Sequence, residues 1–162
     1  MPIKIRHSEN EDITAIKNIY EQASCYAGTL QLPYPSIEKW DKFLSNVSEN
    51  FHSLVAIVDK KIVGQLGMEV YTRPRRKHVA NIGMAVNENF RTQGVGTTLL
   101  AAALDLAQNW AAVTRIELEV YTDNQSAIKL YKKHGFEIEG TAKNYAFRDG
   151  QYVDVYLMAK LF

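Results

Sequence analysis

The first third of the chain predicts one short strand followed by two helices. Apolar and polar residues alternate over 3–6, which is typical of a strand. Ser8 to Glu11 has the spacing of a helix capping box. Segment 25–35 contains one glycine and two prolines and is predicted to be a loop, and a second helix is expected over 36–47. The first helix is indicated by apolar side chains at helical spacing: Ile13, Ile16, Ile19, Tyr20 and Ala23.

The middle of the chain predicts three strands and a long helix. Apolar segments at 54–58, 62–71 and 79–86 are expected to be strands, with a basic loop at 73–77. A helix is predicted over 94–110, because small and apolar residues dominate that segment. Its buried stripe is expected to consist of Val95, Leu99, Ala103, Leu106 and Trp110.

The last third predicts a strand, a helix and a final hairpin. A strand is expected over 115–121, followed by a helix over 124–134 that ends at Gly135. Two strands close the chain and meet at Asp149-Gly150, a dipeptide typical of tight hairpins. The strand–helix–strand unit over 79–121 should pair its strands in parallel, whereas the hairpins should be antiparallel. The order therefore predicts an α/β (α+β) domain over 1–162, with a mixed, mostly antiparallel sheet of seven strands and four helices.

Composition narrows the classes of protein to consider. Of the 162 residues, 46% are hydrophobic and 23% are charged, which is typical of one globular domain. The formal net charge of +1 argues against a dedicated nucleic-acid-binding protein. The one cysteine, Cys25, allows no internal disulfide and favours a reducing compartment. The sequence has no apolar run long enough for a membrane span or a signal peptide, so we expect a cytoplasmic protein.

Segment Arg91 to Gly96 carries the strongest chemical signal. It lies between a predicted strand and a predicted helix and contains one arginine and two glycines. Glycines allow close approach of a ligand to the backbone, and free N–H groups at a helix start bind phosphate. Position 99 is leucine, which excludes the dinucleotide fingerprint, and Gly96 precedes Thr97-Thr98 rather than the lysine of a P-loop. The segment predicts a pyrophosphate site of another type, although the glycines could also serve only a tight turn.

Two segments resemble the hallmark motifs of the GNAT superfamily of acyl-CoA N-acyltransferases. Segment 90–96, FRTQGVG, resembles the family's Arg-x-x-Gly-x-Gly/Ala loop, and segment 123–136, DNQSAIKLYKKHGF, resembles its second motif. The two motifs have the order and separation of the family. Segments 29–33, 73–76 and 137–141 are also similar to a bacterial subgroup described as L-amino-acid N-acetyltransferases.

The resemblance implies a GNAT fold with a splayed parallel strand pair, and acetyl-CoA or coenzyme A as the acyl donor without a metal. In the family, backbone N–H groups of the glycine loop bind the pyrophosphate, and pantetheine adds to the strand before the loop. A backbone N–H of that strand could polarise the thioester carbonyl. The implied coenzyme-binding residues are Met84, Ala85, Val86, Arg91, Thr92, Gln93, Gly94, Val95, Gly96, Thr97, Asn124, Ala127 and Tyr131.

The resemblance also suggests the catalytic groups. Tyr131 matches the family's general acid, and a phenol is protonated at neutral pH; alternatively it belongs to the core. Glu119 matches the general base of some members. It shares a strand face with Glu117, and two neighbouring carboxylates raise each other's pKa. An exposed strand face, or a water molecule acting as the base, is the alternative.

The acceptor is expected to be a small amine, with the α-amino group of an L-amino acid as the first candidate. Loop 24–36 has no charged residue, and the basic loop at 73–77 with Lys143 and Arg148 offers partners for a carboxylate. The proposed acceptor residues are Tyr26, Leu30, Leu32, Arg75, Asn144 and Tyr145. A peptide N-terminus, another small amine or a non-catalytic acyl-CoA sensor are the alternatives. A homodimer is expected from family habit, and neither nucleic acid nor membrane is expected as a partner.

Overall fold

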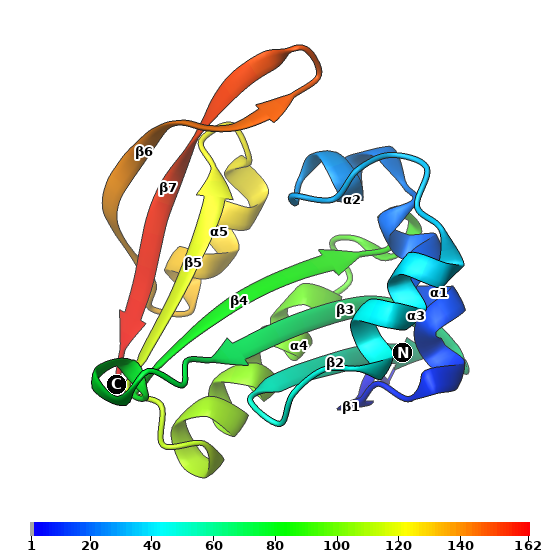
Figure 1. Ribbon diagram of the computed structural model, residues 1–162, viewed down its shortest axis with the longest axis horizontal. Helices are drawn as coiled ribbons and strands as arrows, with labels where there is room; N and C mark the ends of the chain where they lie inside the picture. Colours follow the sequence, from blue (N-terminus) through cyan, green and yellow to red (C-terminus); the bar gives the residue numbers. More distant parts are fainter. Residues whose placement is uncertain (1) are drawn as a thin grey trace.

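A seven-stranded sheet organises the protein, as the computed structural model of residues 2–162 shows (Figure 1). The strand order is β1-β2-β3-β4-β5-β7-β6, and every neighbouring pair is antiparallel except β4 and β5, which are parallel. The mixed α/β architecture predicted from the sequence is confirmed. The strands are β1 (Lys4–His7), β2 (Phe51–Val58), β3 (Lys61–Val70), β4 (Val79–Val86), β5 (Arg115–Tyr121), β6 (Glu137–Arg148) and β7 (Gln151–Leu161).

Within residues 2–162, five α-helices cover the two faces of this sheet, one more than the sequence predicted. They are α1 (Ile13–Tyr20), α2 (Ala23–Ala27), α3 (Ile37–Ser45), α4 (Val95–Asp105) and α5 (Gln125–Lys133). Successive side chains of β2 point to opposite faces of the sheet, and the two faces carry separate hydrophobic cores. Leu54 and Ala56 pack with α4 on one face, and Val55 packs with α1 and α3 on the other. Within the described residues, no helix has the length and apolar composition needed to cross a bilayer.

Two predictions near the N-terminus are wrong. The capping box is formed by Glu9 and Asp12 rather than by Ser8 and Glu11, and the Glu9 N–H donates to Asp12 Oδ2 at 2.7 Å. Asp12 is also held by Arg6, so the box forms where the buried carboxylate has a cationic partner. The segment predicted as a loop from Cys25 begins inside α2, a helix of five residues that is too short to show a periodic pattern.

The buried stripe of α4 differs from the prediction at its end. Val95, Leu99 and Ala103 are buried as expected, but Trp110 is 79% exposed. The helix changes to a π-helical turn over Leu106–Trp110, where the Ala111 N–H donates to the Leu106 carbonyl. A π turn holds more residues than an α turn and shifts the phase of the side chains. Ala107 is therefore buried in place of Trp110.

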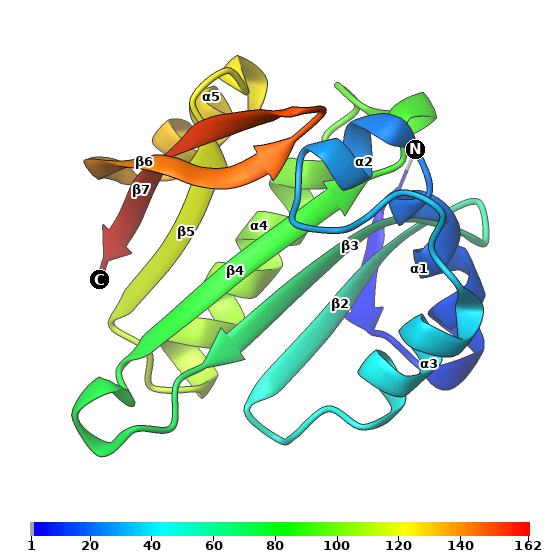
Figure 2. The ribbon, with the colours of Figure 1, turned by 45° about the horizontal axis from the view of Figure 1, so that its top comes forward.

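The parallel strands β4 and β5 separate along their length (Figure 2). Pairing runs from Val79–Arg115 to Asn81–Glu117 and then stops. Beyond that point β4 remains paired with β3 as far as Val86, and β5 remains paired with β7 as far as Tyr121. This confirms the expected splayed pair. It leaves the edge of β4 that faces β5 without a strand partner over residues 82–86.

Candidate functional site

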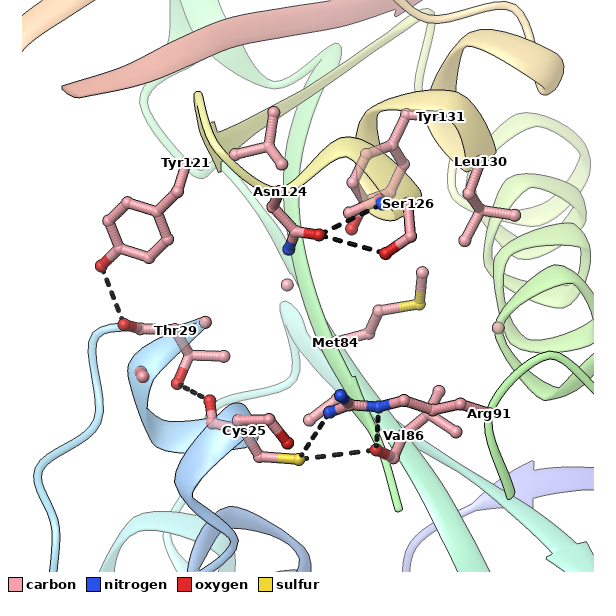
Figure 3. Close-up of a pocket in the computed structure, with 18 of the residues that line it drawn as sticks. Cys25, Thr29, Met84, Val86, Arg91, Tyr121, Asn124, Ser126, Leu130 and Tyr131 are labelled. Atoms are coloured by element: carbon pink, nitrogen blue, oxygen red, sulfur yellow. Dashed lines mark hydrogen bonds between the residues drawn. The ribbon is translucent and has the colours of Figure 1, made fainter. Parts of the chain in front are cut away.

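A cleft of about 780 Å³ opens where β4 and β5 separate (Figure 3). Its walls are the C-terminal halves of both strands, the start of α4, one side of α5, and α2 with the loop that follows it. Segments distant in the sequence therefore meet at one site. The glycine loop and the second motif, segment 123–136, both contribute residues to this cleft.

The glycine loop presents free donors at the start of α4. Gly94 has a φ of 86° and precedes the first helical residue, a conformation that favours glycine. The first internal bond of the helix is made by Thr98, whose N–H donates to the Gly94 carbonyl at 3.0 Å. Across residues 2–162, the N–H groups of Val95, Gly96 and Thr97 have no acceptor. These donors and the positive end of the helix dipole fit an anionic group such as a phosphate.

Gly96 keeps the space beside the helix start open. A Cβ at this position would lie 3.3 Å from Leu130 Cδ2, and within 4 Å of the side chains of Met84 and Val86. Those three side chains come from α5 and β4, so a larger residue would fill the junction between the loop, the strand and the second motif. The absence of a side chain therefore supports close approach of a ligand to the backbone.

Arg91 lies across the end of β4. Its Nε donates to the Val86 carbonyl at 3.4 Å and its Nη2 lies 3.4 Å from Cys25 Sγ. Cys25 is buried, and burial raises the pKa of its thiol in spite of the nearby guanidinium. These contacts connect α2 to the glycine loop and keep a positive charge at the cleft wall.

Tyr131 directs its hydroxyl into the cleft from an otherwise buried ring. The residue is 7% exposed, and its ring packs edge-on against Phe136 with centroids 5.6 Å apart. Its hydroxyl has no hydrogen-bond partner among the described residues, yet no buried polar atom there is left unsatisfied, so the oxygen reaches the cleft. Burial raises the pKa of Tyr131 to about 12. The phenol is therefore a donor throughout the neutral range.

Asn124 caps the helix that carries Tyr131. Its Oδ1 accepts hydrogen bonds from the Ala127 N–H and the Ser126 hydroxyl, both at 3.3 Å (Figure 3). The cap fixes the first turn of α5 beside the cleft. Its amide nitrogen donates to no group within residues 2–162.

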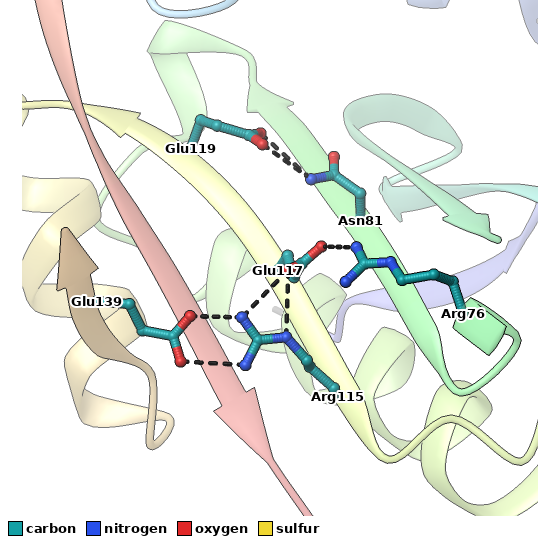
Figure 4. A network of polar contacts seen from close by, with 6 residues as sticks. All are labelled: Arg76, Asn81, Arg115, Glu117, Glu119 and Glu139. Atoms are coloured by element: carbon teal, nitrogen blue, oxygen red, sulfur yellow. Dashed lines mark hydrogen bonds and ion pairs between the residues drawn. The ribbon is translucent and has the colours of Figure 1, made fainter. Parts of the chain in front are cut away.

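The two glutamates of β5 have different surroundings (Figure 4). Glu117 forms ion pairs with Arg76 at 2.7 Å and Arg115 at 3.1 Å, and Arg115 also pairs with Glu139. The repulsion expected between the two glutamates is therefore offset by two guanidinium groups. Glu119 lines the cleft and accepts two hydrogen bonds from Asn81 Nδ2, both at 3.2 Å.

Tyr121 contacts two other segments that line the cleft. Its hydroxyl donates to the Thr29 carbonyl at 2.9 Å, which attaches the loop after α2 to β5. The guanidinium of Arg148 lies 4.8 Å from the centroid of the Tyr121 ring and pairs with Asp123 at 2.5 Å. Arg148, Asp123 and Tyr121 all line the cleft.

Most of the predicted site residues meet in the cleft. Leu30, Tyr145, Glu119 and all the predicted coenzyme residues except Gln93 line it. Tyr26, Leu32, Asn144 and Arg75 do not.

The local fold keeps three of these four residues out of the cleft. Arg75 belongs to a short 3-10 helix before β4, at the opposite end of that strand from the glycine loop. Asn144 lies in an irregular stretch of β6 with a φ of 50°, where its N–H donates to Asp154. Leu32 is 69% exposed on the loop after α2.

Some residues of the cleft were missed from the sequence. Asn81 is the one polar side chain in the apolar strand VANIGMAV, and this contrast could have indicated a functional residue. No local pattern indicated a role for Tyr121 or Asp123. Their partners are distant in the sequence, because Thr29 lies 92 positions from Tyr121 and Arg148 lies 25 positions from Asp123.

Comparison with known proteins assigns the family. Residues 15–136 match the model of the acetyltransferase (GNAT) family. The chain belongs to the GNAT family. It is 46% identical over 159 residues to the L-amino acid N-acetyltransferase AaaT of Escherichia coli strain K12, covering 98% of each chain. The protein is an acetyl-CoA-dependent N-acetyltransferase.

Solved structures of GNAT proteins share this fold. A GNAT acetyltransferase from Streptococcus pneumoniae superposes with a TM-score of 0.85 at 30% identity, covering 99% of this chain and 100% of that one. A spermidine N-acetyltransferase from Vibrio cholerae, solved with CoA and spermine, has a TM-score of 0.89 at 23% identity, with coverages of 98% and 95%.

The contact between Tyr121 and Thr29 yields a prediction about the wall of the cleft. Tyr121→Phe removes the donor and leaves the Thr29 carbonyl to water, which costs about 1 kcal/mol locally. We expect faster amide hydrogen exchange over residues 28–36 and unchanged exchange in β2 and β3. Tyr145→Phe, which removes a hydroxyl from the same wall, is the control. Equal exchange over 28–36 in the Tyr121 variant and the parent would contradict this role.

Proposed function

We propose that the enzyme acetylates the α-amino group of an L-amino acid with an apolar side chain. The observation that carries this proposal is the pair of charges in the acceptor half of the cleft. Among residues 2–162, Glu119 has no cationic partner, and Arg148 lies beyond Tyr121 on the same wall. A carboxylate and a guanidinium that line the same cleft complement the ammonium and carboxylate of a zwitterion. The similarity to an enzyme named for L-amino acids supports the same acceptor.

The coenzyme is proposed to lie along the start of α4 and the open edge of β4. The N–H groups of Val95, Gly96 and Thr97 are free donors for its pyrophosphate, and Arg91 adds a positive charge. The open edge over residues 82–86 offers main-chain groups to the amide-containing pantetheine arm. Met84, Ala127 and Asn124 would flank that arm.

Glu119 is the proposed base and Tyr131 the proposed donor to the leaving group. The attacking amine must lose a proton, and Glu119 is the carboxylate in the cleft without a cationic partner among residues 2–162. The pKa of Tyr131, about 12, lies well above the value of about 8.5 for a free thiol. A hydrogen bond to the departing sulfur is therefore favoured over complete transfer of the Tyr131 proton.

A polyamine acceptor fits the charges of the cleft less well. A polyamine carries several positive charges and requires clustered acids, but Asp123 is already paired with Arg148. The Tyr131 hydroxyl lines the cleft and has no partner among residues 2–162, which supports acyl transfer rather than passive binding of acyl-CoA. The cytoplasmic location and the homodimer stay predictions from the sequence.

The coenzyme site can be tested at Gly96. Gly96→Leu places a side chain against Leu130, Met84 and Val86, so acetyl-CoA binding measured by calorimetry should weaken more than tenfold, or about 1.4 kcal/mol. Gly140→Leu is the control, because a Cβ there meets nothing within 4 Å. Full acetyl-CoA affinity in a folded Gly96 variant would refute the proposed position of the coenzyme.

The acceptor can be tested with matched amines. L-Phenylalanine and phenethylamine differ by the carboxylate, so their kcat/KM values isolate its recognition. We expect a preference of about tenfold to a hundredfold for the amino acid, and Arg148→Gln should remove most of it by raising the KM for the amino acid alone. Spermidine and an N-terminal peptide complete the panel. Absence of acetylated product with every amino acid would reject the proposed acceptor.

The base role of Glu119 predicts a dependence on pH. Glu119→Gln should lower kcat about a hundredfold at pH 7, and much less near pH 9.5, where more of the acceptor amine is neutral without help. Rates at saturating acetyl-CoA and acceptor measure this difference. Glu117→Gln is the control, because Glu117 is paired with Arg76 and Arg115 and does not line the cleft. A loss of equal size at both pH values would exclude the base role.

A further inference from the structure

Asn81 occupies the point at which the parallel strands separate. It is the last residue of β4 paired with β5, opposite Glu117, and it lines the cleft. Its side-chain nitrogen does not bond to this nearest neighbour. It instead reaches the next residue on the same face of β5 and donates to both carboxylate oxygens of Glu119, each at 3.2 Å (Figure 4).

Glu117 provides an internal comparison on the same strand face. Arg76 and Arg115 bind both of its oxygens, and Arg115 continues to Glu139 on β6. Both oxygens of Glu117 are thus engaged by cationic side chains, and the residue belongs to an ion-pair network. Within residues 2–162, the Asn81 amide is the one side chain that donates to Glu119, and it carries no charge.

We propose that Asn81 is a positioning residue for Glu119. A neutral amide fixes the direction of the carboxylate through two hydrogen bonds, and Glu119 stays outside every ion pair among residues 2–162. Because the pair bridges the two strands at the start of the gap, it also sets the distance of Glu119 from the open edge of β4. The inference rests on the proposed function, in which Glu119 receives the proton of the acceptor amine.

The remaining groups that face Glu119 do not replace this contact. Tyr145 on β6 and Tyr71 after β3 lie close enough for the carboxylate to influence them. Burial raises the pKa of both phenols, and Glu119 raises it further, so both are neutral in the range of an assay. The negative charge of Glu117 is offset by Arg76 and Arg115. The direction of Glu119 therefore depends on the Asn81 amide.

A double-mutant cycle tests the proposal. Asn81→Ala should lower kcat about tenfold at pH 7 and change the KM for acetyl-CoA less than twofold. In the Glu119→Gln background, Asn81→Ala should cause no further loss, because both changes remove the same function. Arg76→Gln, which alters the partner of Glu117 on the same face, should leave kcat within twofold of the parent.

A second variant gives a signature that a merely structural role would not produce. Asn81→Asp places two carboxylates within hydrogen-bond reach, and such a pair shares a proton at low pH. A protonated acid can donate to Glu119 as the amide does, whereas two ionised groups repel each other. We expect kcat near that of the parent at pH 6 and near that of Asn81→Ala at pH 8.5. This variant also remains informative if Asn81→Ala fails to fold.

The outcomes separate this proposal from the proposed function. Equal losses from Asn81→Ala in the parent and Glu119→Gln backgrounds would overturn the positioning role and leave Glu119 as the base. A Glu119→Gln enzyme with unchanged kcat would overturn both roles, while the amine panel still decides the acceptor. An Asn81→Asp profile parallel to that of the parent would likewise reject positioning through the hydrogen bond.

Discussion

The site depends on the loss of pairing between β4 and β5 after Asn81 and Glu117. A parallel pair would normally continue and satisfy the main-chain groups of both strands. Here β4 retains β3 on one side and β5 retains β7 on the other, so neither strand is released from the sheet. The open edge of β4 is thus held in the sheet by β3 and is still available to a ligand. A thioester donor that contains amide groups suits such an edge, because it can supply the hydrogen bonds that a strand would have made.

The helices on one face of the sheet complete this arrangement. The start of α4, Leu130 of α5 and Met84 of β4 meet at Gly96, so the floor of the gap is packed with apolar side chains. The free N–H groups of α4 lie at one end of this floor, and Tyr131 contributes its hydroxyl from α5. The two sequence motifs therefore act at one place, although a strand and a loop separate their helices in the chain.

Local patterns predicted well the elements and the residues that line the cleft around the start of α4. Residues 84–86 and 91–97 are continuous in sequence around one strand and one helix start, so their relative positions follow from local structure. The proposed acceptor half depended on contacts that no local pattern encodes. Arg75 is basic and close in sequence to β4, yet β4 itself separates it from the cleft. Trp110 was misplaced because a single π turn changes the phase of a helix, which periodicity alone does not reveal.

The pair of Arg148 and Asp123 bears on how an acceptor carboxylate would be recognised. The Asp123 side chain is 63% exposed, so its ion pair with Arg148 is worth at most about 1 kcal/mol. A substrate carboxylate can compete with such a pair, or share the five donors of the guanidinium. The Tyr121 ring meanwhile restricts the orientation of the guanidinium, which lowers the entropy lost on binding. Because the Tyr121 hydroxyl also holds Thr29, the loop after α2 and the proposed carboxylate site depend on the same residue.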